Sequence, residues 1–126
     1  MTSVRIACAQ IAPAVGDAEG NRRRAHEAVR EAIGAGARIV LLPELVASGY
    51  VFESAEEARA LAQPVDAPAL SDWAEEAAGS EAVVVGGFAD AGGLVTFVAG
   101  WVGFESFLGV TTLKSRAESF RCLGTE

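Results

Sequence analysis

The sequence predicts a layered α/β fold, and two observations carry that prediction. Over the first 90 residues, short apolar segments alternate with segments of helical periodicity in the order strand, helix, strand, helix, helix, strand. The chain is 51% hydrophobic and 21% charged, a balance typical of a globular domain rather than of a disordered chain. Its 126 residues can bury one core and leave little room for a second domain.

The first strand is expected over Val4–Ile11, a short apolar segment that ends before Pro13. Asp17 is expected to cap the helix that follows, because its carboxylate can accept hydrogen bonds from the free amides of the first turn. Gly34 and Gly36 are expected to end that helix. The residues that recur at helical spacing, and so form its predicted inward face, are Ala25, Ala28, Val29, Ala32 and Ile33.

The second strand is expected over Arg38–Leu42, where both faces are apolar, as in a sheet covered by helices. Pro43 ends it, because proline has no amide to donate to the sheet. Two further helices are predicted over Ala55–Gln63 and Pro68–Ala78, and a buried strand over Glu81–Phe88. The residues expected to face inward on the second of these helices are Leu70, Trp73, Ala74 and Ala77.

Charge and composition exclude several classes of partner. A net charge of −7 with a single lysine argues against nucleic acid, whose phosphates require clustered Lys and Arg. The longest apolar run, Leu94–Phe104, is too short to span a membrane, and no signal peptide is expected at the N-terminus. Cys8 and Cys122 do not form a disulfide framework, so the expected location is the cytoplasm.

Glu44 carries most of the functional signal, because it directly follows the second predicted strand. Open α/β sheets bind ligands at the carboxyl ends of their strands. The neighbours of Glu44 are mostly apolar, so its carboxylate is expected to lose hydration and to become a stronger general base. The alternative is an ordinary loop glutamate that caps a backbone group or faces water.

The segment Leu41–Tyr50, Leu-Leu-Pro-Glu-Leu-Val-Ala-Ser-Gly-Tyr, resembles the first catalytic segment of the nitrilase superfamily, the carbon–nitrogen hydrolases. Other segments agree with this resemblance in order and spacing, and together they cover about residues 3–90. They are Val4–Gln10, Val15-Gly16-Asp17 with Asn21, Gly34–Arg38 and Val84–Phe88.

The resemblance implies a four-layer αββα sandwich that assembles into homo-oligomers through a helical face. It also implies hydrolysis of C–N bonds in small amides, carbamoyl compounds or nitriles by a cysteine, a lysine and a glutamate. In this family the glutamate is the general base toward the thiol, the thiolate attacks carbon to form a thioester, and the lysine stabilises negative charge. Glu44 corresponds to that glutamate. No metal and no organic cofactor is implied.

The lysine and the cysteine of the family have no clear counterpart in this chain. Lys114 follows Glu44 at about the sequence separation found in the family, but it lacks the family's basic and aromatic neighbours. The alternative is that it is a surface lysine. Cys122 follows Lys114 too closely for the strand that separates the two in the family, and its setting offers nothing to ionise a thiol. Cys8, in the first strand, is expected to be a buried structural thiol.

Two other residues have open interpretations. His26 is expected on the solvated face of the first helix, and a lone histidine makes no metal site. Tyr50, after Ser48-Gly49, either lines the pocket or is a packed surface ring. The glycine pairs Gly86-Gly87 and Gly92-Gly93 follow or flank a strand, but their spacing does not form a phosphate-binding loop.

The chain changes character at residue 91. Residues 1–90 hold 7 arginines, 14 acids and 22 alanines, whereas residues 91–126 hold 3 basic residues, 3 acids and 3 alanines. The family resemblance stops at the same point. We therefore expect residues 1–90 to be the N-terminal part of a hydrolase domain and residues 91–126 to be an atypical tail, read in a shifted frame or from a truncated gene. A divergent native tail is the alternative.

Overall fold

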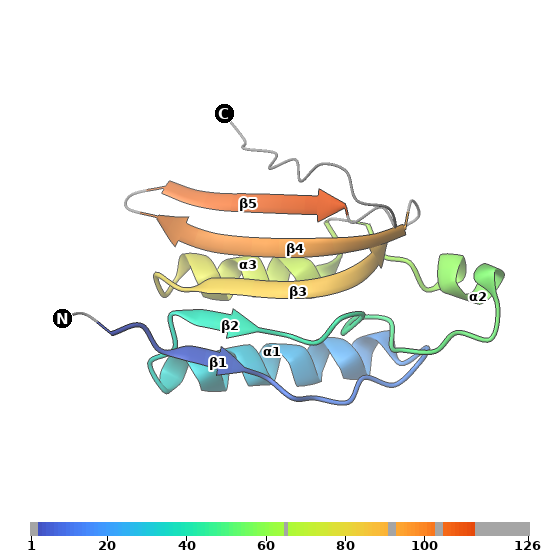
Figure 1. Ribbon diagram of the computed structural model, residues 1–126, viewed down its shortest axis with the longest axis horizontal. Coiled ribbons are helices and arrows are strands. Elements are labelled where there is room, and N and C mark those ends of the chain that lie inside the picture. Colours follow the sequence, from blue (N-terminus) through green and yellow to red (C-terminus); the bar gives the residue numbers. More distant parts are fainter. Residues whose placement is uncertain (1–2, 65, 91–92, 103–104, 113–126) are drawn as a thin grey trace.

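The computed structural model describes residues 3–64, 66–90, 93–102 and 105–112, the last two ranges as backbone only. Figure 1 shows helices and strands in the order β1-α1-β2-α2-α3-β3-β4-β5. Through β3 this is the order that the sequence predicts, so the α/β fold class is confirmed. The bounds are β1 Ile6–Cys8, α1 Ala18–Gly34, β2 Ile39–Leu41, α2 Ala55–Ala60, α3 Pro68–Ala78, β3 Val83–Asp90, β4 Gly93–Val102 and β5 Glu105–Thr112.

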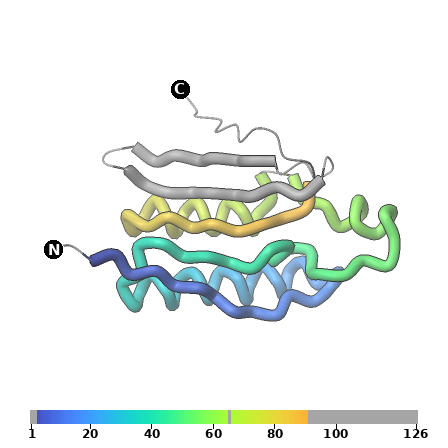
Figure 2. Tube along the Cα trace, viewed as in Figure 1, coloured from blue at the N-terminus to red at the C-terminus, as the bar shows by residue number. Residues whose placement is uncertain are grey.

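The strands form one sheet in the order β1-β2-β3-β4-β5. β1, β2 and β3 are parallel, with Ile6 opposite Ile39 and Ile39 opposite Val83. β4 pairs antiparallel with β3, and β5 pairs antiparallel with β4. The helices that connect the parallel strands, α1 and α3, contact each other and lie on one side of the sheet (Figures 1 and 2). The described residues therefore form two layers, a sheet and a helical layer.

The hydrophobic core lies between these two layers. Alternate residues of β3 face the helices, so Val84 and Phe88 are buried, as is Val40 of β2. Trp73 of α3 is fully buried against Gly86, where a Cβ atom would lie 2.9 Å from the indole Cζ3. All the predicted inward residues of α1 and α3 except Ala28 belong to this core or pack against it, namely Ala25, Val29, Ala32, Ile33, Leu70, Trp73, Ala74 and Ala77.

The helix ends follow local sequence signals. The Asp17 carboxylate accepts a hydrogen bond from the Gly20 amide at 3.0 Å, so the predicted cap of α1 is confirmed. Pro68 occupies the first turn of α3, where a missing amide costs nothing, and Gly79 follows its last residue. α2 is shorter than predicted, ending at Ala60, because Gln63 precedes a proline and so avoids helical backbone angles.

Ion pairs fix α3 against α1 on the side away from the sheet. Arg22 forms two hydrogen bonds to the Asp72 carboxylate, at 2.7 and 3.2 Å. One turn further along α1, His26 Nε2 lies 2.8 Å from Glu76 Oε1. The side chain of His26 is 33% exposed, so it is only partly solvated on the face that the sequence predicts to be solvated. Its Nδ1 lies 4.0 Å from Asp72 Oδ2, so His26 contacts two acidic residues of α3.

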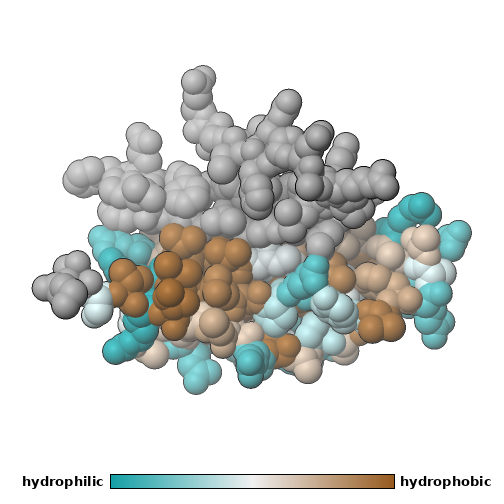
Figure 3. Space-filling model, viewed as in Figure 1, coloured by the Kyte–Doolittle hydropathy of each residue, from teal (hydrophilic) through white to brown (hydrophobic). Residues whose placement is uncertain are grey.

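The other side of the sheet, here called the outer face, is formed at β1 and β2 by Ile6, Cys8, Ile39 and Leu41. Ile6 is 57% and Leu41 38% exposed, and Figure 3 shows apolar side chains gathered over these strands. Among the described residues α1 and α3 lie together on one side, so no helix covers this outer face. Cys8 is exposed rather than buried for the same reason. No helix among the described residues has the length and apolar character needed to cross a membrane.

Candidate functional site

Glu44 lies just beyond the carboxyl end of β2, as predicted. The Leu42 amide still donates to the Val85 carbonyl of β3, at 2.8 Å, but Pro43 has no amide and sheet pairing stops there. The chain then turns through Glu44–Ser48. Leu45 has φ +52°, a left-handed conformation that a non-glycine residue adopts only under constraint. The turn therefore holds Glu44 beyond the carboxyl ends of the parallel strands, on a strained segment of backbone.

The Glu44 turn rests directly on β3. The Val46 amide donates to the Gly87 carbonyl at 3.2 Å. A Cβ atom at Gly87 would lie 3.1 Å from Glu44 Cα and 3.4 Å from Glu44 Cγ. The absence of a side chain at Gly87 thus lets the turn approach the strand and lets the Glu44 side chain lie against it.

The carboxylate of Glu44 is exposed, and its partner is Tyr50, whose hydroxyl donates a hydrogen bond to Oε2. The expectation that Glu44 loses its hydration among apolar neighbours is therefore wrong for the described residues. The pKa of Tyr50 is raised above its ordinary value of 10.0, first by this hydrogen bond and then by the negative charge of Glu44. Tyr50 is 53% exposed and does not line the cavity described below, so it is a surface ring that contacts Glu44.

The loop formed by residues 44–50, here called the Glu44 loop, packs against the segment that joins β1 to α1. Gly16 donates its amide to the Ser48 carbonyl at 3.3 Å. Gly49 has φ +90°, and a Cβ atom there would lie 2.6 Å from the backbone of Val15. Asn21, at the start of α1, donates to the Ala47 carbonyl at 3.2 Å. Ser48 and its two neighbours Ala47 and Gly49 are all buried.

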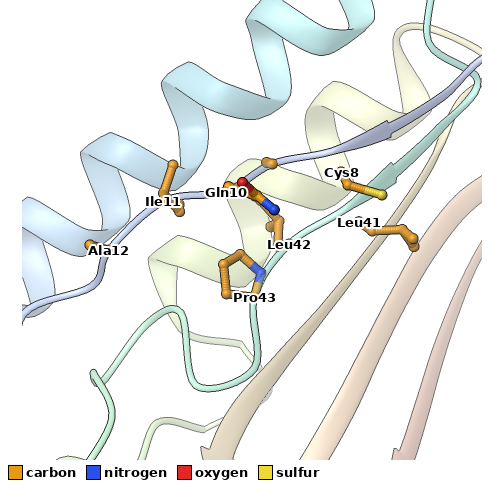
Figure 4. Close-up of a pocket in the computed structure, with 8 residues that line it drawn as sticks. Cys8, Gln10, Ile11, Ala12, Leu41, Leu42 and Pro43 are labelled. Atoms are coloured by element: carbon orange, nitrogen blue, oxygen red, sulfur yellow. The ribbon is translucent and has the colours of Figure 1, made fainter.

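An open cavity of about 540 Å³ lies where β1 and β2 end (Figure 4). Cys8 and Leu41, which are opposite each other in the sheet, line one part of it. Gln10, Leu42 and Pro43 line the part nearer the Glu44 turn. The cavity is therefore adjacent in sequence to Glu44 and combines an apolar lining with a thiol and an amide.

Of the other thiol and lysine candidates, Cys8 is the one within the described residues, and it lines this cavity. Lys114 and Cys122 lie outside them. Cys8 is exposed on the outer face of the sheet. In the ranges that the structure describes, no group of three or more His, Cys, Asp and Glu residues is arranged to hold a metal ion.

The comparisons with known proteins agree with this geometry. The family model of the carbon-nitrogen hydrolases matches residues 5–99. The chain belongs to the carbon-nitrogen hydrolase family. The matched range contains the Glu44 loop and continues past Asp90 into β4, while the boundary expected at residue 91 stays a prediction.

Among the relatives of this carbon-nitrogen hydrolase chain is a nitrilase from Pyrococcus abyssi, 32% identical over 108 residues. That alignment covers 84% of the chain and 41% of the nitrilase. The chain thus spans about two fifths of the length of this relative.

Solved structures share the fold. A CN-hydrolase superfamily protein from Xanthomonas campestris, with an arsenic adduct in its active site, has a TM-score of 0.59 and 23% identity. The match covers 88% of this chain and 36% of that one. An amidase from Nesterenkonia sp. has a TM-score of 0.57 and 23% identity, over 90% of this chain and 44% of its own.

Sequence reasoning found Glu44 but missed how it is held. The contact with Tyr50 depends on a turn whose left-handed residue, Leu45, is not a glycine and so leaves no local signal. Asn21 entered the sequence argument only as part of a helix start, although an asparagine among the apolar positions of α1 is a signal for a buried amide. Cys8 and Gln10 line the cavity because β1 ends early, which composition did not indicate.

Proposed function

We propose that this chain provides the base-bearing part of a hydrolase that cleaves C–N bonds in small amides, carbamoyl compounds or nitriles. The observation that carries the proposal is Glu44, exposed at the carboxyl end of β2, with one carboxylate oxygen engaged by Tyr50. Its other oxygen is then left to exchange a proton with a nucleophile or with water.

The proposed reaction proceeds through a thioester. Glu44 accepts the proton of a cysteine thiol, and the thiolate attacks the carbonyl carbon of an amide. Collapse of the tetrahedral intermediate breaks the C–N bond, and Glu44 returns the proton to the departing amine. Glu44 then takes a proton from water, whose attack on the thioester releases the acid and regenerates the thiol. A lysine stabilises the negative charge on the substrate oxygen.

The cysteine and the lysine of this proposal are the residues left to identify. A solved variant of the Nesterenkonia amidase carries the product of Michael addition of acrylamide at its active site cysteine, which supports a thiol nucleophile by analogy. Cys8 and Cys122 are the two thiols of this chain, and Lys114 is its one lysine. Separate Cys8→Ser and Cys122→Ser variants distinguish the two thiols.

The test is ammonia release from simple amides and nitriles by the purified 126-residue chain. Activity that is lost in Glu44→Gln and kept in Glu56→Gln, an exposed glutamate of α2, supports the proposal. Activity that survives Glu44→Gln removes Glu44 from the base role. If no ammonia is released, this chain has no hydrolase activity of its own. That result favours the alternative, a non-catalytic module that binds a full-length relative.

The origin of residues 91–126 is tested by resequencing the coding DNA downstream of the Gly87 codon. Another frame that restores a basic and aromatic lysine segment, and a later cysteine in a glycine-rich turn, supports the proposed frame shift. Confirmation of the present frame supports a divergent native tail. We also propose homo-oligomers that form through a helical face, to be checked by sedimentation, and a cytoplasmic location.

A further inference from the structure

Asn21 is the buried polar residue at the base of the Glu44 loop. Its side chain is 1% exposed, although it lies in the first turn of α1. Its Nδ2 donates to the Ala14 carbonyl at 2.7 Å and to the Ala47 carbonyl at 3.2 Å. Its Oδ1 accepts from the Ala14 amide at 2.8 Å and from Arg24 at 2.7 Å. One side chain thus contacts the segment after β1 and the loop after β2.

These four hydrogen bonds use the full capacity of a carboxamide, which has two donors and two acceptor positions. The orientation of the amide is also determined, because a rotated group would place its NH₂ against the Ala14 amide and the Arg24 guanidinium. No other side chain of similar size offers both functions in this arrangement, since an acid lacks the two donors and a leucine lacks all four groups. The position therefore requires asparagine for its hydrogen bonding rather than for its volume.

The bond to Ala47 has a consequence for the Glu44 loop. Ala47 lies between Glu44 and Tyr50, the two residues that form the exposed hydrogen bond of the site. Gly16 and Gly49 bring the same two segments together at neighbouring points, but through backbone alone. We propose that Asn21 is a positioning residue for Glu44. The buried amide of Asn21 links the Glu44 loop to the segment after β1, and so keeps the Glu44 carboxylate and the Tyr50 hydroxyl within hydrogen-bonding distance.

The role of Asn21 in catalysis rests on the proposed function, but the link that Asn21 makes between the two segments does not. Without Asn21 the Ala47 carbonyl is left buried with no side-chain donor, and the loop gains freedom to open. Glu44 and Tyr50 then lose their fixed separation. The reaction would be slowed through the geometry of the base, without any change in the chemistry of Glu44 itself.

The experiment compares amide hydrogen exchange in the full chain, in Asn21→Ser and in Val29→Ala at neutral pH. Val29 is a fully buried α1 residue, and its truncation lowers stability without removing a hydrogen bond between the two segments. In Asn21→Ser the amides of Val46 and Gly49 are expected to exchange about tenfold faster relative to those of α3. In Val29→Ala the ratio between loop and α3 amides stays as in the wild type. An unchanged ratio in Asn21→Ser overturns the inference.

A second readout follows Tyr50, the one tyrosine of the chain, through the near-ultraviolet absorbance of its ionised ring. The pKa of Tyr50 is raised by contact with Glu44, so Asn21→Ser should move its titration toward that of Glu44→Gln. A role in global stability alone would not produce that shift, and a titration identical to the wild type argues against positioning.

A third measurement covers the case in which Asn21→Ser does not fold. In the wild type, the two segments should open together. The amides of Ala14 and Val46 should therefore show equal protection from exchange at each denaturant concentration. Independent opening of the two overturns the inference. None of these readouts needs substrate, so an inactive chain with coupled segments contradicts the proposed hydrolase and leaves the positioning role intact.

Discussion

The hydroxyl of Tyr50 donates a hydrogen bond to the carboxylate of Glu44 across a turn that contains a left-handed leucine. Both side chains are exposed, so the bond forms at the surface rather than in a closed pocket. It engages one carboxylate oxygen of Glu44 and leaves the other available. The bond also makes Tyr50 a reporter on the state of the site.

The first prediction uses that reporter. Glu44 raises the pKa of Tyr50 above 10.0, so Glu44→Gln is expected to shift the tyrosine titration to lower pH. Because the folded pKa lies above the unfolded one, the bond stabilises the fold fully below pH 10.0, and this contribution is lost as pH rises through the folded pKa. Absorbance of the single tyrosine measures the shift. Glu56→Gln should leave the titration unchanged, and an equal shift in that control would remove Glu44 as the cause.

The second prediction concerns Gly86 and the core. A Cβ atom at this position would lie 2.9 Å from the ring of Trp73 and 3.3 Å from Leu42 Cβ. Gly86→Ala is therefore expected to lower the free energy of unfolding by about 1 to 3 kcal/mol through overpacking. Gly34→Ala, where an added Cβ meets nothing within 4 Å at the end of α1, should instead raise it by about 0.5 kcal/mol. Urea denaturation measures both, and equal effects would contradict the packing argument.

The third prediction separates backbone conformation from close approach. Gly16 (φ +79°) and Gly49 (φ +90°) both have left-handed conformations, but only at Gly49 would an added Cβ atom meet another backbone segment. Gly16→Ala should cost about 1 kcal/mol from the backbone conformation alone. Gly49→Ala should cost about 1 to 3 kcal/mol more, because its Cβ would lie 2.6 Å from Val15. If the two variants unfold at the same urea concentration, the Glu44 loop does not depend on that approach.

Parts of this structure that depend on local signals could be predicted from sequence. Pro68 and Gly79 mark the two ends of α3, and Asp17 caps the start of α1. Pro43 ends the second strand, so Glu44 could be placed at a strand end. Features that depend on what covers a surface could not. Cys8 lies in an apolar segment that is typical of a buried strand, yet it is exposed because α1 and α3 lie on the same side of the sheet. Glu44 is exposed as well, although its neighbours in sequence are mostly apolar.

The fourth prediction is a pH dependence at the start of α1. Hydrogen bonding from the Gly20 amide, and then from Arg24, lowers the pKa of Asp17 below its ordinary value of 3.8. Because the folded pKa is the lower one, the charged cap stabilises the fold above pH 3.8, and this contribution is lost as pH falls through the folded pKa. Asp17→Asn keeps the cap hydrogen bond without the charge.

The thermal midpoint of the wild type should therefore exceed that of Asp17→Asn near neutral pH, and the difference should vanish in acid. Asp17→Ser, which is also an uncharged cap, should follow Asp17→Asn across the whole pH series. Asp17→Ala removes the cap itself, so it should stay less stable than both in acid as well. Thermal unfolding followed by circular dichroism measures all four chains. A difference between wild type and Asp17→Asn that persists in acid would mean that the carboxylate charge does not stabilise α1.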